Sequence, residues 1–212
     1  MTRLYLVRYG ESVWSAQHRW QGAADPPLSE AGAQQARHLA GRLRAARVAA
    51  VYTSPLRRAA QTARIVAAAC GLAPRVVDGL REVGFGEWEG LTAEEVERRY
   101  ASLLPRRQAR PDLIRIPGGE PLEQARQRVM EAVAGIARAH PGAAVAVVAH
   151  GGVNRLVLLT LLGAPLASYS RFQQAPGCVN VVDIAERSGR ILAINDTDHL
   201  EPPPAVRPAA PL

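Results

Sequence analysis

The 212-residue sequence contains no lysine, only two cysteines, and no apolar run approaching the ~18 residues that a membrane-spanning helix needs. Cys70 and Cys178 are too far apart for a C-x-x-C motif, which argues against a disulfide framework and a cysteine zinc site. The N-terminus reaches Arg8 before the apolar core of a signal peptide can form. We therefore predict a cytoplasmic protein with reduced thiols and no membrane partner.

Positive charge is carried by arginine alone, with 26 basic against 19 acidic residues and a net charge of +7. These arginines are spread along the chain in singles and short pairs. Basic composition by itself supports statements about solubility and nonspecific contacts only. We predict no nucleic-acid partner and favour a basic pocket for a small phosphorylated molecule. The spacing of histidine, cysteine and acidic residues suggests no metal site, so we expect neither a metal nor another cofactor.

Hydrophobic periodicity and turn residues predict strands that alternate with helices. The predicted strands are 3–8, 48–53, 143–149, and a closing hairpin of 179–185 with 191–194. The predicted helices are 31–45 after a Ser29 cap, one that begins at Ser54-Pro55 and stops at Gly71, 92–100, 122–140 and 151–162. The basic segment 106–121 is predicted to be a loop or lid.

The alternation indicates an α/β fold, a three-layer α/β/α sandwich with a mainly parallel central sheet. The run 143–149 is almost continuously apolar, which is typical of a strand buried on both faces of such a sheet. The length fits one domain, which we place at 1–200. Residues 201–212 are rich in proline and are predicted to form a disordered tail.

Groups that bind anions follow three predicted strands. Arg8 ends the first strand, Arg58 lies just beyond the second, and His150 follows the apolar run 143–149. Ligands of open α/β sheets bind beyond the carboxyl ends of the strands, where these residues would meet. The planar guanidinium fork suits phosphate oxygens. The sequence therefore predicts a phosphate site formed by Arg8, Arg58 and His150.

Glycines and helix starts add to this site. Gly10 and Gly151 would let the backbone approach a bound anion, and the helices after Ser54 and His150 would supply backbone donors. From the residues alone no good nucleophile is evident, because the phenol of Tyr9 is mostly protonated at neutral pH.

A candidate acid lies in the glycine-rich segment L-R-E-V-G-F-G-E-W-E-G. Glu82 could donate a proton to a leaving alcohol if burial favours its neutral form. Glu87 and Glu89 are nearby alternatives that we expect to be solvated.

Five motifs follow one another along the chain: L-V-R-Y-G-E-S, W-Q-G-A-A-D-P-P-L-S-E-A-G, Y-T-S-P-L-R-R-A-A-Q-T-A, L-R-E-V-G-F-G-E-W-E-G and V-V-A-H-G-G. Together they resemble the histidine phosphatase superfamily, the phosphoglycerate mutase-like proteins, over about residues 3–200. The resemblance implies a metal-independent phosphomonoesterase for a small phosphorylated substrate. It assigns phosphate binding to Arg8 and Arg58, the second site histidine to His150, and the proton donor to Glu82.

Two positions depart from the family pattern. Tyr9 stands where the family has its nucleophilic histidine, and Ser15 stands where it usually has asparagine near the phosphate. We expect Tyr9 to impair or alter phosphoryl transfer, because an aryl phosphate is a more stable intermediate than phosphohistidine. The alternative is a pseudoenzyme, or an inactivated variant, that binds phosphorylated ligands without turnover. Gln21 and Gly22 are predicted to join Ser15 at the rim of the substrate site.

The short interval between Glu82 and His150 resembles small broad-specificity phosphatases and α-ribazole-phosphate phosphatases more than the mutases. The segment 106–121, which lies in this interval, does not indicate the substrate. The oligomeric state also stays open, with a homodimer among the options.

Overall fold

The computed structural model describes residues 1–185 and 188–200, and the prolines of the predicted tail 201–212 lie outside this part. Its sheet has six strands in the order β3-β2-β4-β1-β5-β6. Strands β3, β2, β4 and β1 are parallel to one another, whereas β5 is antiparallel to both β1 and β6. The strands are β1 Thr2–Arg8, β2 Ala50–Thr53, β3 Pro74–Val76, β4 Ala144–Ala149, β5 Val179–Ala185 and β6 Ser188–Asp196.

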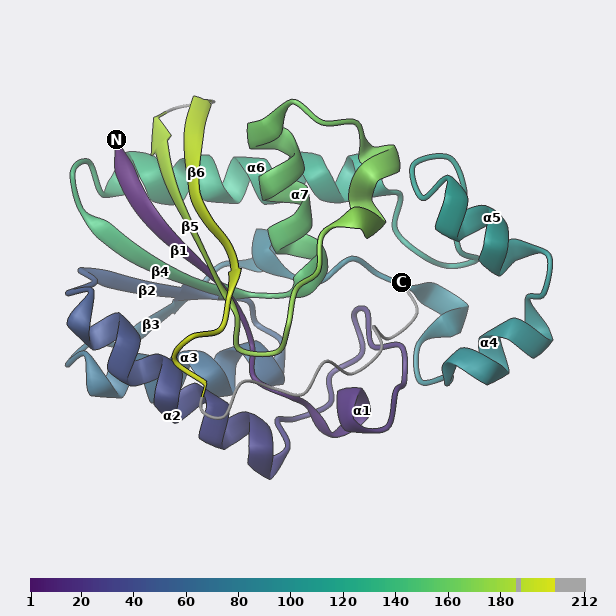
Figure 1. The fold of residues 1–212 in the computed structure, drawn as a ribbon, viewed down its shortest axis with the longest axis horizontal. Helices are drawn as coiled ribbons and strands as arrows, with labels where there is room; N and C mark the ends of the chain where they lie inside the picture. The colour runs from purple at the N-terminus through teal and green to yellow at the C-terminus, as the bar shows by residue number, and fades with distance from the viewer. Residues whose placement is uncertain (186–187, 201–212) are drawn as a thin grey trace.

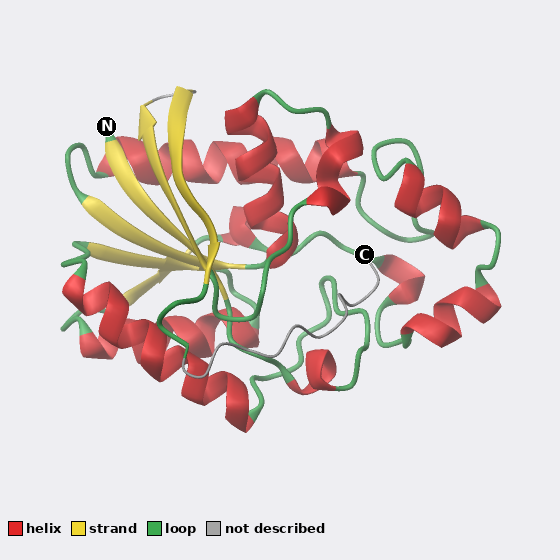
Figure 2. Ribbon diagram, viewed as in Figure 1, coloured by secondary structure: helices red, strands yellow, loops and turns green. Residues whose placement is uncertain are grey.

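Helices cover both faces of the sheet, which confirms the three-layer α/β/α sandwich (Figures 1 and 2). Helices α2 (Glu30–Ala45) and α3 (Arg57–Ala69) pack on one face, and α6 (Leu122–Ala139) and α7 (Gly151–Leu162) pack on the other. None of the helices in the described residues is long and apolar enough to cross a membrane.

Strand β4 shows how the sequence produces these layers. Val145 and Val147 pack with the α6 and α7 side, whereas Ala146 and Val148 pack with the α2 and α3 side. All four residues are at most 1% exposed. Successive strand residues point to opposite faces, so a strand covered on both faces needs an unbroken apolar run. The predicted doubly buried strand is confirmed.

A small helical cap lies beside this sandwich, on the right in Figure 1. It contains α4 (Ala93–Arg99) and α5 (Leu103–Ala109) and has an apolar core of its own. The buried members of that core are Trp20, Trp88, Val96, Leu104 and Ile116. Shorter helical turns complete the described chain: α1 (Val13–Ala16), η1 (Asp78–Leu80), η2 (Gly86–Trp88) and η3 (Leu166–Arg171).

The residues that begin and end several helices agree with the sequence-based prediction. The Ser29 hydroxyl accepts a hydrogen bond from the Gly32 amide at the start of α2, and Thr92 and Glu95 form a reciprocal capping box at α4. Gly71 follows α3 with a φ of +68°, in the left-handed region that ends many helices.

Three expectations were wrong. The segment 106–121 is not a loop throughout, because 106–109 belongs to α5. Helix α3 begins at Arg57, and Ser54 instead turns its buried side chain toward the site. Strand β2 begins at Ala50 rather than at residue 48. In addition, the three-residue edge strand β3 was not predicted, since so short a segment carries no alternating pattern.

Candidate active site

Three neighbouring strands deliver the predicted anion-binding groups to one edge of the sheet. Arg8 ends β1, His150 directly follows β4, and Arg58 lies in the first turn of α3, after β2. Because β2, β4 and β1 are adjacent and parallel, their carboxyl ends share that edge. The structure therefore brings Arg8, Arg58 and His150 together.

The ring of Tyr9 lies among these three groups. Its centroid is 5.5 Å from the Arg8 guanidinium carbon, 5.0 Å from that of Arg58 and 5.3 Å from the centroid of the His150 ring. The residue is only 3% exposed. The guanidinium groups are within reach of cation–π attraction, which favours this placement of the ring.

Three buried donors or acceptors of the site lack hydrogen-bond partners among the described residues. They are Arg8 Nε, Arg58 Nε and His150 Nδ1. An unsatisfied buried polar group costs about 1–3 kcal/mol, and such groups at the carboxyl edge of a sheet are typical of functional sites. Their arrangement fits an anionic ligand with several acceptor oxygens.

Arg58 is fully buried and is fixed by the loop that precedes α2. Its Nη1 donates to the Ala24 carbonyl at 2.6 Å and its Nη2 donates to the Gly22 carbonyl at 2.7 Å. The bonds hold the guanidinium group beside the Tyr9 ring and leave Nε without an acceptor among the described residues. Gly22, which was predicted as a rim residue, therefore acts here through its carbonyl oxygen.

A network of buried side-chain amides lies next to Arg8 and is connected to it through Gln174. Arg8 Nη1 donates to the Gln174 carbonyl, and the Gln174 side chain bonds to Asn154 at 3.0 Å and to Asn180 at 2.8 and 2.9 Å. All three amides are at most 2% exposed. Isolated Asn and Gln residues carry no recognisable spacing, so no sequence pattern points to these three residues.

The electrostatics of His150 follow from its neighbours. Burial, followed by the charges of Arg58 and Arg8, holds the pKa of His150 well below its usual value. Its imidazole is therefore neutral at pH 7, with Nε2 hydrogen-bonded to the Ser54 hydroxyl at 2.8 Å. Ser54 is fully buried and is a site residue, although its sequence context predicted only the start of a helix.

Glu82 lies beside the first turn of α7. Its Oε2 accepts a hydrogen bond from the Gly152 amide at 3.1 Å, and its Oε1 accepts one from the Val83 amide at 2.9 Å. A Cβ atom on Gly152 would lie 2.3 Å from Glu82 Oε1 and 2.4 Å from the Tyr169 hydroxyl. The close approach of these two groups therefore requires a glycine at position 152.

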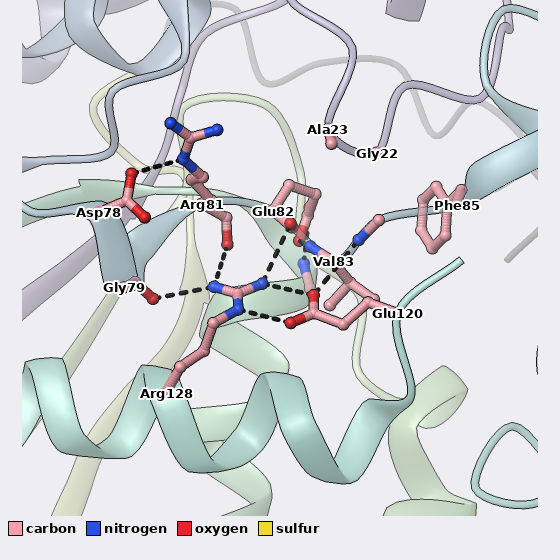
Figure 3. Close-up of polar contacts among 12 residues, drawn as sticks. Gly22, Ala23, Asp78, Gly79, Arg81, Glu82, Val83, Phe85, Glu120 and Arg128 are labelled. Carbon is pink, nitrogen blue, oxygen red and sulfur yellow. Dashed lines mark hydrogen bonds and ion pairs between the residues drawn. The ribbon is translucent and has the colours of Figure 1, made fainter. Parts of the chain in front are cut away.

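Arg128 of α6 fixes the backbone that carries Glu82 (Figure 3). Its guanidinium donates to the carbonyl oxygens of Gly79, Arg81 and Glu82 at 2.9, 2.8 and 3.2 Å. The same group forms two hydrogen bonds of 2.7 Å with the Glu120 carboxylate. Glu120, in turn, accepts a longer bond from the Gly84 amide.

The other predicted site residues lie nearby, and their polar groups form hydrogen bonds with neighbouring protein residues. The Gly10 amide donates to Thr62, and a Cβ on Gly10 would lie 2.2 Å from the Gly32 carbonyl oxygen. Gly10 is thus needed for contact with α2, and its role beside a bound anion stays a prediction. At Gly151 the nearest atoms lie 3.6 Å or more from a Cβ, so the glycine requirement falls on Gly152 instead.

The rim residues Ser15 and Gln21 are joined through Ser12. Ser12 and Ser15 form a reciprocal cap at α1, and the Ser12 hydroxyl donates to Gln21 Oε1 at 2.7 Å. Of the two alternative acids, both of which were expected to be solvated, one is not fully exposed. Glu87 is exposed and bonds to a cap tyrosine, whereas half-buried Glu89 accepts the Ala23 and Phe85 amides.

A cavity of about 320 Å³ opens beside Glu82. It is lined by Arg81, Arg115 and Arg128 together with acidic and glycine residues of 78–84 and 118–120. In the described part of the chain, no group of three or more His, Cys, Asp or Glu side chains could hold a metal ion.

Comparison with known proteins places the chain in a family. The model of the histidine phosphatase superfamily (branch 1) matches residues 4–197. Phosphoserine phosphatase 1 of Hydrogenobacter thermophilus is 34% identical, with 94% of this chain and 95% of that protein covered. The probable phosphoglycerate mutase GpmB of Yersinia pestis is also 34% identical, with 96% and 97% covered.

A solved structure agrees with this placement. The YhfR protein of Bacillus stearothermophilus superposes with a TM-score of 0.88 at 32% identity, covering 94% of this chain and 99% of that one. The names of the relatives support a phosphatase-type function. The chain belongs to the histidine phosphatase superfamily.

Proposed function

We propose that this protein binds the phosphomonoester of a small metabolite and hydrolyses it slowly, with Tyr9 in the place of the family's nucleophilic histidine. The observation that carries the proposal is the convergence of Arg8, Arg58 and His150 on Tyr9. The two guanidinium groups offset the charge of a phosphate dianion. No residue cluster suited to a metal is needed for this chemistry, so we propose that it is metal-independent.

The slow step follows from the chemistry of the phenol. When Tyr9 Oη bonds to phosphorus, the bond to the leaving alcohol must break and the phenol must lose its proton, for which the unpaired Nδ1 of the neutral His150 is the neighbouring acceptor. Glu82 would supply a proton to that alcohol. The resulting aryl phosphate is more stable than a phosphoramidate, so water removes the phosphoryl group slowly.

The direct test compares the protein with its Tyr9→His variant in a chromogenic phosphatase assay. We expect the histidine variant to be faster by at least about 10³-fold, which is the scale of loss when a covalent nucleophile is removed. Chelator should leave both rates unchanged. Equal rates for the two proteins would contradict the role given to position 9.

A pseudoenzyme is the second candidate, and two contacts favour it. The Tyr9 ring is almost wholly buried against the arginines, and both Nη atoms of Arg58 are bonded to backbone carbonyls. Mass spectrometry after incubation with substrate separates the candidates. A phosphoryl group on Tyr9 supports slow transfer, whereas phosphate binding without modification or turnover supports the pseudoenzyme.

A further inference from the structure

Glu89 joins two segments that lie far apart in the sequence. Its Oε1 accepts a hydrogen bond from the nearby Phe85 amide at 2.8 Å and one from the Ala23 amide at 2.9 Å, 66 residues earlier in the chain. Glu89 forms no ion pair with another described residue. The two amides are therefore the groups that fix its carboxylate.

The carboxylate packs directly against the loop that contains Ala23. A Cβ atom on Gly22 would lie 2.2 Å from Glu89 Oε1 and 2.7 Å from the Phe85 amide nitrogen. Gly22 also has a φ of +52°, in the left-handed region that favours glycine. Position 22 therefore needs a glycine for the loop and the carboxylate to meet.

A single peptide unit connects Glu89 with Arg58. The Ala23 N–H that Glu89 binds and the Gly22 carbonyl that accepts Arg58 Nη2 at 2.7 Å belong to the same planar group. In a trans peptide the N–H and the carbonyl point in opposite directions, so an acceptor on one side fixes the direction of the carbonyl on the other. Arg58 Nη1 bonds to the next carbonyl, that of Ala24, at 2.6 Å.

We propose that Glu89 is a positioning residue that orients Arg58 for anion binding through this peptide. The inference rests on the proposed phosphate site. Both Nη atoms of Arg58 are held by the loop, and the buried Nε has no acceptor among the described residues. The direction of the Gly22 carbonyl therefore decides where Nε and the remaining N–H groups point. Glu89 itself touches neither the anion nor the reacting atoms.

The charge of Glu89 and its reach have opposite effects on anion binding. A negative charge near the site opposes a bound anion, so removing that charge favours binding by itself. Losing the contact with Ala23 instead releases the carbonyl that orients Arg58, which weakens binding. Variants that change charge and reach separately can therefore identify which effect operates.

Sulfate binding, measured by calorimetry on the full chain at constant ionic strength, is the first test. Glu89→Asp keeps the charge but is one methylene too short to reach both amides, and we expect it to bind sulfate about 10-fold more weakly. Glu89→Gln loses the charge but keeps an acceptor oxygen at the same reach, so its affinity should stay within about 3-fold of the parent protein.

Glu87→Asp is the matched control. Glu87 lies two residues earlier, is exposed, and bonds to the Tyr100 hydroxyl rather than to the loop. The same shortening there should leave the affinity for sulfate unchanged. Thermal unfolding of each variant without sulfate adds a separate readout, and a lower melting temperature of Glu89→Asp with unchanged affinity would mean that Glu89 only stabilises the fold.

Coupling with Arg58 is the second test. In the Tyr9→His protein, Glu89→Ala should lower kcat/KM for 4-nitrophenyl phosphate by about 10-fold. When Arg58→Ala is also present, Glu89→Ala should change kcat/KM by less than about 2-fold, because the group that it orients is absent. A role that does not pass through Arg58 would give the same loss in both proteins.

The opposing outcomes separate this inference from the proposed function. If Glu89→Asp binds sulfate like the parent protein, if Glu89→Gln loses as much affinity as Glu89→Asp, or if Glu89→Ala acts equally with and without Arg58, the positioning role is refuted while the phosphate site stands. If Arg58→Ala binds sulfate as tightly as the parent protein, the phosphate site and the positioning role are refuted together.

Discussion

The ring of Tyr9 meets the imidazole of His150 edge-on, with 5.3 Å between the ring centroids and 62° between their planes. Both rings are buried, and both lie beside Arg58. A ligand that reaches the unpaired donors of the two arginines must therefore contact the phenol as well. Substitutions at position 9 can therefore distinguish effects on ligand binding from effects on phosphoryl transfer.

Phosphate binding should be coupled to proton uptake by His150. The pKa of His150 is depressed by burial and by two guanidinium groups, and a bound dianion would offset those charges and raise it. We expect net proton uptake on binding sulfate, which stays a dianion over this range and stands in for phosphate, at pH 6 and less at pH 8. Calorimetry in buffers of different ionisation enthalpy measures this, and a His150→Asn variant should show no such difference between buffers.

Replacing Glu82 should affect poor leaving groups most. In the Tyr9→His protein, we expect Glu82→Gln to lower kcat for an alkyl phosphate by roughly 10²–10⁴-fold, because the alcohol then leaves without a proton. 4-Nitrophenyl phosphate should lose much less, since its leaving oxygen hardly needs protonation. Equal losses on both substrates would show that Glu82 has only a structural role.

A methyl group at position 152 should disturb Glu82 without removing it. The Cβ of Gly152→Ala would overlap both the carboxylate and the Tyr169 hydroxyl, so kcat for an alkyl phosphate should fall in the Tyr9→His protein. Gly41→Ala is the control, since a Cβ there meets nothing within 4 Å. In helix α2 that control should add about 0.5–1 kcal/mol of stability and leave kcat unchanged. An unimpaired Gly152→Ala enzyme would contradict the close packing.

The ion pair between Arg42 and Asp196 should stabilise the fold in a pH-dependent way. Hydrogen bonding to Arg42 lowers the pKa of Asp196 to about 2, so the contribution is complete above the ordinary carboxyl pKa and is lost as pH falls toward 2. Because water screens this half-buried pair, we expect Asp196→Asn to cost about 1–2 kcal/mol at pH 7. The loss should shrink below pH 4. Denaturant unfolding of Asp196→Asn and of Asp78→Asn, an exposed pair, provides the comparison.

Features set by neighbouring residues were predicted from the sequence. The Ser29 cap, the Thr92 capping box and the apolar strand β4 depend on local spacing, and each was found where the sequence indicated it. Arg8, Arg58 and His150 also met as expected, because the ends of adjacent parallel strands must lie at one edge.

Contacts between distant segments were not predictable in this way. Gln174 reaches Arg8 from 166 residues along the chain, and the Tyr169 hydroxyl meets Gly152 only because η3 folds over α7. Such roles emerge from tertiary packing, which single-sequence patterns do not encode.

The main chain at position 9 is clamped on both sides. Its amide donates to the Ala149 carbonyl at 3.2 Å, and its carbonyl accepts from the Gly177 amide at 3.0 Å. A side chain installed there must therefore start from the same Cα and leave in the same direction. Histidine, cysteine, serine and aspartate could therefore be substituted in turn at position 9, and each side chain would face the same phosphate site on an unchanged backbone. Differences in rate across that series would report the intrinsic reactivity of each nucleophile, with geometry held constant.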